Sequence, residues 1–268
     1  MSKIIIHGGF FSESSTNIET KIAKQQALLR IVKDSYAYLQ NHSALETVVY
    51  AVSQLEDDEL FNAGIGSQIQ SDGKIRMSAS LMDGESQKMS GVINIEEVKN
   101  PIQVAQVLMQ VDDRILGGSG ATNFARKHGF EPFSTEIPQR RAEYEAKLAS
   151  LGTGTVGCVA LDNNGKIAVA TSTGGKGFEI PGRISDSATV AGNYANEFCG
   201  VSLTGVGEDI VSNATAAKIV TRVTDGFSIE KAFEKTFAEL KPYDGFAGAI
   251  GIDKQGNIFH QDSHPSMV

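Results

Sequence analysis

The 268-residue sequence contains no tryptophan, six prolines and only two cysteines, Cys158 and Cys199. Small secreted domains that depend on disulfides carry far more cysteine, so that class of protein is excluded. Both cysteines lie within apolar segments, which favours small buried side chains over a disulfide or a pair of metal ligands. The five histidines also lack the close spacing of a zinc site.

The sequence also lacks any apolar run of the about 20 residues that a transmembrane helix needs. Its first residues, MSKIIIHGG, do not contain the apolar stretch of a signal peptide. A formal net charge of −8 argues against nucleic acid or an anionic membrane as the main partner. We therefore expect a soluble protein in the reducing environment of the cytoplasm.

Hydrophobic residues make up 41% of the chain, enough to bury a sizeable core in a single domain spanning residues 1–268. Two apolar strand patterns, TVGCVALD and KIAVATST, are joined by Asn163-Asn164-Gly165, a strong short-range hairpin signal. Other patterns predict a strand at residues 3–7, a hairpin turning at residues 71–73 and a final hairpin at residues 248–262. Helical spacing predicts helices near residues 17–39, 43–55, 101–111, 121–128, 209–223 and 228–240.

Both halves of the sequence thus combine strands with two or three helices. Hairpins imply antiparallel sheets and argue against a doubly wound parallel fold. We expect an α+β protein with the architecture of a four-layer αββα sandwich, in which two antiparallel sheets pack together under helices. Residues 130–154 interrupt this pattern, because prolines are followed there by the charged segment QRRAEYEAKLASLG. We interpret them as an exposed connector with a polar helix, although an ordinary surface helix fits the composition equally well.

With thiol and metal sites disfavoured, hydroxyl groups are the remaining candidates for catalysis, and Thr155 is the candidate nucleophile. It is the first residue of a predicted buried strand and directly follows Gly154. A threonine hydroxyl needs a neighbouring base, and cleavage of the chain before Thr155 would create one in the new α-amino group. Gly154 would leave its carbonyl open to attack. A Gly-Thr pair that opens a strand is more often only a turn, so this signal is weak by itself.

The segments around Thr155 strengthen the hypothesis. The predicted hairpin would bring the Thr173 hydroxyl next to Thr155, because paired strands lie about 5 Å apart. Arg183 and Asp186 stand three residues apart and could hold the carboxylate and ammonium of an amino acid, although a surface ion pair would look the same. The segment LTGVGE ends a strand and opens a helix, a place where amide groups can bind an oxyanion or form only an ordinary turn.

Several of these motifs together resemble one family. GTVGCVALDNNGKIAVATSTGG, PGRISDS, NYAN and TGVGED are similar to the β-subunit of plant-type asparaginases and isoaspartyl peptidases. IHGG, LFNAGIGSQIQSDG, ASLMDG, SGVINIEEVKNPI and GATNFARKHG are similar to its α-subunit, so the resemblance covers nearly the whole chain in order. These proteins are N-terminal-nucleophile hydrolases that use a threonine. The resemblance implies the αββα fold.

The resemblance also implies that the precursor cleaves itself between Gly154 and Thr155. Residues 1–154 would then form the α-subunit and residues 155–268 the β-subunit. Thr155 would be the nucleophile and, through its amine, the general base. Thr173 would tune it by a hydrogen bond, and Asn62 resembles the asparagine that helps to position it.

The remaining implied roles concern the substrate. Arg183 would bind its α-carboxylate and Asp186 its α-amino group. Thr204 and Gly205 would form the oxyanion hole, and Gly207 would add a substrate contact. No cofactor is implied, but a structural sodium ion would be wrapped by backbone carbonyls of Leu55, Glu56, Asp58, Phe61, Ala63 and Ile65. The resemblance further implies a homodimer of cleaved αβ protomers.

We therefore expect an amidohydrolase that cleaves L-asparagine and β-aspartyl dipeptides through a threonine acyl-enzyme. Two alternatives stay open at this point. One is a glycosylasparaginase-like amidase, which the absence of tryptophan mildly disfavours. The other, from a different class, is an uncleaved and catalytically silent precursor that acts as a binding protein.

Overall fold

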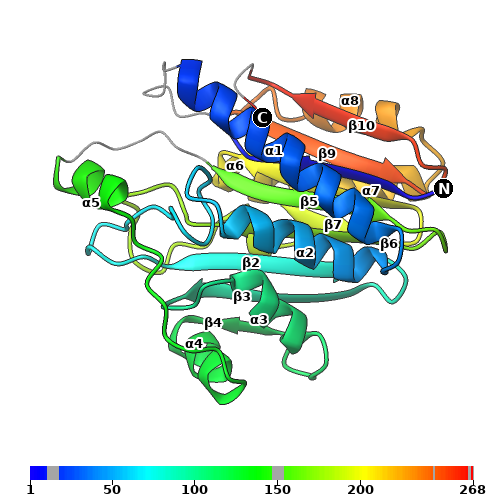
Figure 1. Cartoon of the computed structure of the whole chain (residues 1–268). Coiled ribbons are helices and arrows are strands. Elements are labelled where there is room, and N and C mark those ends of the chain that lie inside the picture. The colour runs from blue at the N-terminus through cyan, green and yellow to red at the C-terminus, as the bar shows by residue number, and fades with distance from the viewer. Residues whose placement is uncertain (11–17, 147–153, 244, 265–266, 268) are drawn as a thin grey trace.

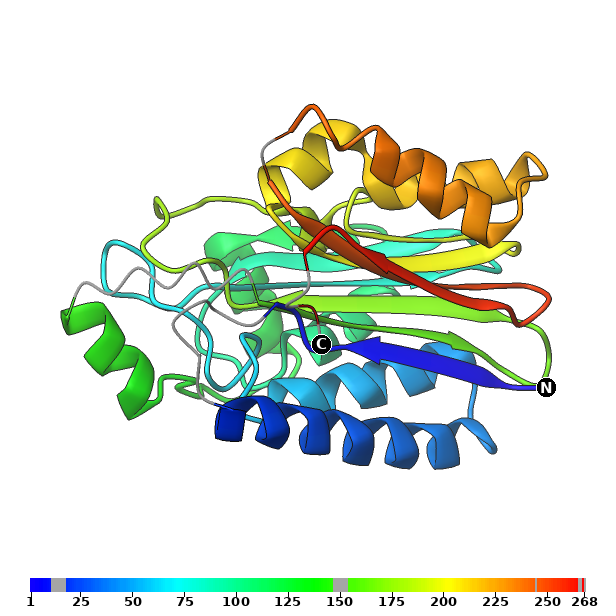
Figure 2. The same ribbon diagram turned by 90° about the horizontal axis from the view of Figure 1, so that it is seen from above.

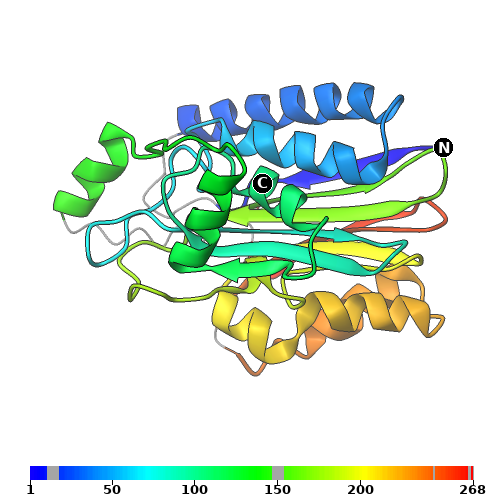
Figure 3. The ribbon, with the colours of Figure 1, turned by 90° about the horizontal axis from the view of Figure 1, so that it is seen from below.

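Two β-sheets lie face to face between layers of helices (Figures 1 and 2). The computed structural model describes residues 1–10, 18–146, 154–243, 245–264 and 267. Helices cover the outer face of each sheet, so the order of layers is helix, sheet, sheet, helix, as expected for an αββα sandwich (Figure 3).

The larger sheet has six strands in the order β1-β5-β6-β2-β3-β4. Its strands are β1 (Lys3–His7), β2 (Met77–Asp83), β3 (Lys88–Ile95), β4 (Ile115–Gly117), β5 (Thr155–Leu161) and β6 (Ile167–Thr173). All neighbours are antiparallel except β3 and β4, which pair in parallel. The parallel pair follows from its connection, because helix α3 carries the chain back before the short edge strand β4 begins.

The smaller sheet has four antiparallel strands in the order β10-β9-β8-β7. Its strands are β7 (Asn193–Ala195), β8 (Cys199–Gly205), β9 (Ala247–Asp253) and β10 (Ile258–Asp262). The final hairpin, β9 to β10, confirms the prediction made for residues 248–262.

The helices divide between the two outer layers. Those packed on the larger sheet are α1 (Ile18–Leu39), α2 (Ala44–Glu56), α3 (Pro101–Leu108) and α4 (Gly118–Lys127). Those packed on the smaller sheet are α7 (Thr215–Thr224) and α8 (Ile229–Ala238). The connections carry α5 (Pro138–Glu145), α6 (Gly207–Asn213) and a 3-10 helix (Asp186–Ala188).

Strand β5 shows how the sequence pattern determines the layers. All seven of its residues are buried, because one face packs on helices and the other on the second sheet. Val156 and Cys158 belong to the core under the helices, whereas Val159 and Leu161 belong to the core between the sheets. Side chains alternate along a strand, so Thr155 shares the inter-sheet face with Val159 and Leu161.

Most local predictions are confirmed. Ser43 caps α2 with the predicted capping box, in which Glu46 accepts from the Ser43 main chain. Pro101 opens α3, and Ser228 caps α8. Both cysteines are buried and free, and burial raises the pKa of each thiol.

Two predictions differ from the structure, and the one for the connector is confirmed in part. The single helix expected at 209–223 is two helices, α6 and α7, because Ala214 adopts a left-handed conformation with φ 51°. Residues 65–70, before the predicted turn at 71–73, form no strand, since β2 pairs instead with β3 and β6. Of the connector 130–154, residues 138–145 form the predicted polar helix, whereas residues 147–153 lie outside the described part of the chain, as does Asn17.

Among the helices of the described residues, none combines the length and the apolar character that a membrane crossing requires.

Candidate active site

Thr155 opens β5 at one end of the larger sheet and is 6% exposed. The antiparallel register places it opposite Thr173, the last residue of β6, as the hairpin prediction required. The Thr155 hydroxyl donates to Thr173 Oγ1 over 3.2 Å. The Ser187 hydroxyl lies 3.3 Å from Thr155 Oγ1 on another side. Because the Thr155 hydrogen is already donated to Thr173, Ser187 is the donor in this second contact.

The carbonyl oxygen of Gly154 lies directly beside these hydroxyls. It accepts from Asn62 Nδ2 at 2.8 Å and from Thr173 Oγ1 at 3.0 Å. A β-carbon at position 154 would lie 2.7 Å from the Asn62 β-carbon, closer than such atoms approach. Residue 154 is therefore a glycine because Asn62 must come this near to the peptide bond. Two donors on one carbonyl are the arrangement that stabilises a developing oxyanion.

Asn62 is itself held by main-chain groups on three sides. Its Oδ1 accepts from the Gln68 amide at 3.0 Å, and its Nδ2 also donates to the Gly175 carbonyl. The amide of Gly174 donates to the Asn62 carbonyl at 2.9 Å. Asn62 thus joins the loop after α2 to the loop after β6. These contacts fix the position of Asn62 Nδ2, which donates to the Gly154 carbonyl oxygen.

Arg183 and Asp186 come together near Thr155, but they do not form an ion pair with each other. Arg183 donates from Nε and Nη2 to the two carboxylate oxygens of Glu208, each over 2.9 Å. These hydrogen bonds lower the pKa of Glu208 to about 2, against a smaller raising by burial. Sequence reasoning missed Glu208 as a partner, although it lies next to Gly207 in the TGVGED motif.

Asp186 is 2% exposed and opens the 3-10 helix. Burial raises the pKa of its carboxyl to about 7, which the positive charge of Arg183 only partly opposes. Its Oδ2 atom has no hydrogen-bond partner. A buried acceptor without a donor is costly, so this oxygen is suited to a ligand ammonium group.

The end of β8 supplies the other predicted site residues. Thr204 is fully buried in the strand, and Gly205 ends it with φ 142°. Gly207 opens α6, where an added β-carbon would lie 2.8 Å from Asp186 Oδ1 and 3.0 Å from Arg183 Nη2. The predicted substrate residues from two separate segments therefore converge on one place.

A small cavity of about 10 Å³ lies between these groups. Its lining consists of Gly154, Thr155, Thr173, Gly175, Lys176, Arg183, Ser185, Asp186 and Gly205. Such a volume holds about one water molecule. In the uncut chain, therefore, the site residues are assembled but leave no room for an amino acid, and Gly154 is part of the wall.

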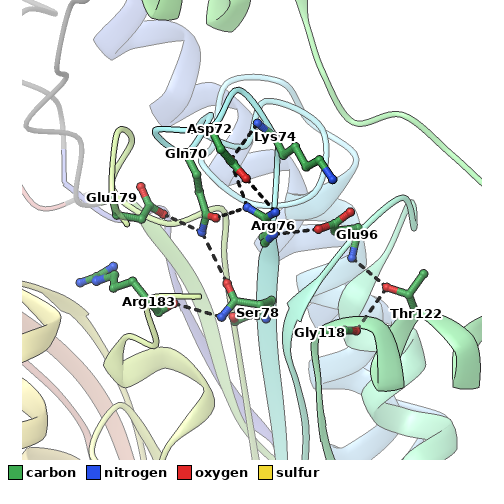
Figure 4. A network of polar contacts seen from close by, with 11 residues as sticks. Gln70, Asp72, Lys74, Arg76, Ser78, Glu96, Gly118, Thr122, Glu179 and Arg183 are labelled. Atoms are coloured by element: carbon green, nitrogen blue, oxygen red, sulfur yellow. Dashed lines mark hydrogen bonds and ion pairs between the residues drawn. The ribbon is translucent and has the colours of Figure 1, made fainter. Parts of the chain in front are cut away.

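A network of polar side chains supports the segment that carries Arg183 (Figure 4). Asn94 Nδ2 donates to the main-chain carbonyl of Arg183 at 3.2 Å, and Asn94 has φ 53°. Gln70 Nε2 contacts Asn94 Oδ1 and Glu179 Oε1, each at 3.4 Å. Arg76 donates from Nη1 to Gln70 Oε1 at 2.6 Å. These residues join segments far apart in sequence, and no local pattern pointed to them.

The loop predicted to wrap a sodium ion leads from α2 towards Asn62. Three of its predicted carbonyl ligands already accept amide hydrogen bonds: Leu55 from Asp58, Glu56 from Ile65 and Asp58 from Phe61. A carbonyl oxygen that accepts one amide hydrogen keeps a second lone pair, whereas the Leu55 carbonyl also accepts from the Asp57 amide. Oxygen donors of this kind are those that a hard cation prefers. Among the described residues, no group of three or more His, Cys, Asp or Glu side chains is arranged as a metal site.

Comparison with known proteins agrees with this arrangement. A family model described as asparaginase matches residues 1–147 and 135–268. An isoaspartyl peptidase/L-asparaginase of Synechocystis sp. is 46% identical, covering 99% of this chain and 86% of that protein. A protein of the same name from Nostoc sp. is 44% identical over 96% of this chain and 87% of its own length.

A third relative is the isoaspartyl peptidase of Escherichia coli, which is 36% identical over 95% of this chain and 88% of its own length. The matches span both halves of the chain, including the strand that begins at Thr155 and the segments that carry Asn62 and Arg183. This chain therefore belongs to the asparaginase family.

Proposed function

We propose that this protein cleaves itself before Thr155 and then hydrolyses L-asparagine and β-aspartyl dipeptides. The observation that carries the proposal is the peptide bond between Gly154 and Thr155. Its carbonyl oxygen receives two hydrogen bonds, and two successive hydrogen bonds link the Thr155 hydroxyl to that oxygen through Thr173. The relatives that bear both enzymatic names support the choice of substrates.

In the precursor, the nitrogen of Thr155 is an amide and cannot act as a base. The hydroxyl instead donates to Thr173, which donates to the Gly154 carbonyl oxygen. As Thr155 Oγ1 attacks the Gly154 carbonyl carbon, its proton can pass through Thr173 towards the oxygen that becomes negative. Asn62 stabilises that oxygen. The Thr155 nitrogen takes up that proton as the C–N bond breaks, which leaves an ester and a free α-amine. Water then hydrolyses the ester, releasing the Gly154 carboxylate and restoring the Thr155 hydroxyl.

The freed amine is the base for turnover. It accepts the proton of the Thr155 hydroxyl, which attacks the side-chain carbonyl of the substrate. Thr204 and Gly205 stabilise the resulting oxyanion. The leaving group of the substrate, ammonia or the amine of a dipeptide, takes this proton from the Thr155 α-amine and departs. Water then hydrolyses the acyl-enzyme to release aspartate.

The two ends of the substrate match the charges of the site. The Arg183 guanidinium binds the α-carboxylate of the substrate. This carboxylate either displaces the Glu208 carboxylate from Arg183 or binds to the guanidinium together with it. The unpartnered oxygen of Asp186 receives the α-ammonium group. The departure of Gly154 from the wall of the cavity supplies the space, which explains why cleavage must come before turnover.

A sodium ion held by the loop carbonyls from Leu55 to Ile65 would fix the segment that leads to Asn62. An ion that binds only the folded chain raises its melting temperature. We expect a higher Tm in sodium chloride than in choline chloride at equal ionic strength, and equal values would reject the ion.

We also propose a homodimer of cleaved protomers, which light scattering tests by yielding twice the mass of one chain.

The variant Thr155→Ala should neither cleave itself nor release ammonia from asparagine, because it lacks the attacking hydroxyl. Intact-mass measurement and an ammonia assay check both effects. Near-normal activity in the variant would reject the nucleophile. A wild-type chain that stays in one piece and is inactive would instead favour the silent precursor.

Asn62→Ala should slow self-cleavage by about 100-fold, the usual cost of one oxyanion donor. Thr204→Ala is the matched comparison, because Thr204 is proposed to stabilise the oxyanion formed during turnover, whereas Asn62 and Thr173 bind the Gly154 carbonyl oxygen. It should cleave at close to the wild-type rate but turn over slowly. A time course by mass spectrometry measures the rate of self-cleavage, and kcat of the cleaved protein measures turnover. Equal cleavage rates for wild type and Asn62→Ala would show that Asn62 does not stabilise the oxyanion of self-cleavage.

Arg183→Ala should raise KM for asparagine by on the order of 10-fold to 100-fold, because it removes a bidentate contact to a carboxylate. Steady-state kinetics with asparagine and with its α-amide measure this effect. The variant should lose the preference for asparagine over the α-amide. Unchanged KM and kcat would remove Arg183 from the site.

A further inference from the structure

Ser187 places a hydroxyl group against the proposed nucleophile, although neither its motif nor the family resemblance gave it a role. It is fully buried in the 3-10 helix, one residue after Asp186. Its Oγ atom lies 3.3 Å from Thr155 Oγ1, almost as close as Thr173 Oγ1 at 3.2 Å. The nucleophilic oxygen thus lies between two hydroxyl groups that come from different segments of the chain.

The direction of these contacts follows from the one group among them that has no hydrogen to donate. The Gly154 carbonyl oxygen can only accept, so the Thr173 hydroxyl donates to it at 3.0 Å. Thr173 Oγ1 therefore accepts from Thr155, whose single hydrogen is used there. Ser187 is left as the donor to Thr155 Oγ1, and its own oxygen accepts from Ser185 Oγ over 3.5 Å. Each of the four contacts then carries one hydrogen.

The position of Ser187 does not depend on the peptide bond that self-cleavage would break. Ser80 in β2 is fully buried and donates to the Ser187 carbonyl at 2.6 Å. The amide and the hydroxyl of Thr189 both donate to the Asp186 carbonyl at 2.8 Å, which closes the 3-10 helix. A β-carbon at Gly192 would lie 2.5 Å from Asp186 Oδ2, so this helix also packs closely against the turn before β7.

Thr155 Oγ1 is the attacking oxygen in the first half of turnover and the leaving oxygen in the second. When the acyl-enzyme is hydrolysed, water bonds to the acyl carbon and the bond from that carbon to Oγ1 breaks. The Thr155 α-amine takes a proton from the water and delivers it to Oγ1, which gains negative charge as the bond breaks. A hydrogen bond to a charged oxygen is stronger than one to a neutral oxygen. A donor beside Oγ1 therefore favours departure over attack.

We propose that Ser187 is a catalytic residue for deacylation, which donates a hydrogen bond to Thr155 Oγ1 as this oxygen leaves the acyl group. Ser187 keeps its own proton throughout, so the atoms and charges of the reaction balance without it. The same contact acts in self-cleavage, where Oγ1 leaves the ester that it has formed with Gly154. The inference rests on the proposed function, because it requires Thr155 to carry the acyl group.

The test is Ser187→Ala, which removes the donor and keeps a small side chain in the buried position. L-Aspartate β-methyl ester is the probe, because an ester acylates the enzyme faster than an amide and leaves deacylation as the slower step. We expect kcat for this ester to fall by about 10-fold or more, as for the loss of a hydrogen bond to a charged group. KM should fall in parallel, so that kcat/KM stays within about 2-fold of the wild-type value.

The intact mass of the β-subunit during turnover provides the second readout. A larger fraction of the variant than of wild type should carry the β-aspartyl group on Thr155, since the acyl-enzyme decays more slowly. Ser86→Ala is the matched control, because it removes a serine hydroxyl from the exposed turn between β2 and β3. It should match wild type in both measurements.

A fall in kcat/KM as large as the fall in kcat would overturn the proposal, because Ser187 would then act before the acyl-enzyme forms or only hold the site together. A kcat equal to that of wild type would overturn it as well. A wild-type chain that releases no ammonia from asparagine would refute the proposed function itself, and this inference with it.

A variant that stays in one piece is still informative. Neutral hydroxylamine splits an ester under conditions that leave peptide bonds intact. If the Ser187→Ala chain is split by this reagent before Thr155, the ester has formed and its breakdown is the slowed step, as proposed. A chain that the reagent leaves whole would contradict the proposal, since attack by Oγ1 would then be the step that was lost.

Discussion

The pairing of β5 with β6 is the constraint on which the site depends. It places Thr155 opposite Thr173 at the end of the larger sheet and brings the Thr173 hydroxyl into contact with both Thr155 and the Gly154 carbonyl. Thr173 also accepts from the Gly175 amide, so its one hydrogen and its acceptor positions are all engaged. A hydroxyl with no freedom to rotate is well suited to pass a proton in one direction.

The space between the sheets is divided along the strands. Apolar side chains such as Val159, Val169 and Ile252 fill the end far from the site. Buried polar residues that are linked by hydrogen bonds follow, and the row of Thr155 and Thr173 comes last; the linked residues are His7, Thr171, Asn193 and Ser202. Buried polar groups cost free energy unless they are bonded, but a fully connected set rigidifies its surroundings. In the proposed function these polar residues lie directly behind the nucleophile, whereas the apolar end supplies the burial that stabilises the sandwich.

The site also holds charges that the fold alone does not satisfy. Glu208 keeps the Arg183 guanidinium in place, whereas Asp186 has a buried oxygen without a donor. A ligand that brings both a carboxylate and an ammonium group complements these two features together. In the proposed function, selectivity for amino acids over simple amides would depend on the distance between these two charged groups.

Local sequence patterns determined the elements whose contacts are near in the chain. Asn163-Asn164-Gly165 specified the hairpin and hence the pairing of Thr155 with Thr173, because a tight turn leaves one register for the strands it joins. The family resemblance indicated that Arg183, Asp186 and Gly207 share one site, and the structure brings them together. The contact of Thr155 with Thr173, in contrast, is one that the length of the turn determines.

Only the tertiary structure decided the contacts between distant segments. Arg183 pairs with Glu208 rather than Asp186, Asn94 supports the Arg183 main chain, and His7 meets Ser202 across 195 positions. The break at Ala214 is likewise imposed from outside, since alanine favours a continuous helix by its own propensity. Such contacts depend on how the two sheets are stacked, and no periodicity along one strand or helix records which residue of the other sheet lies opposite.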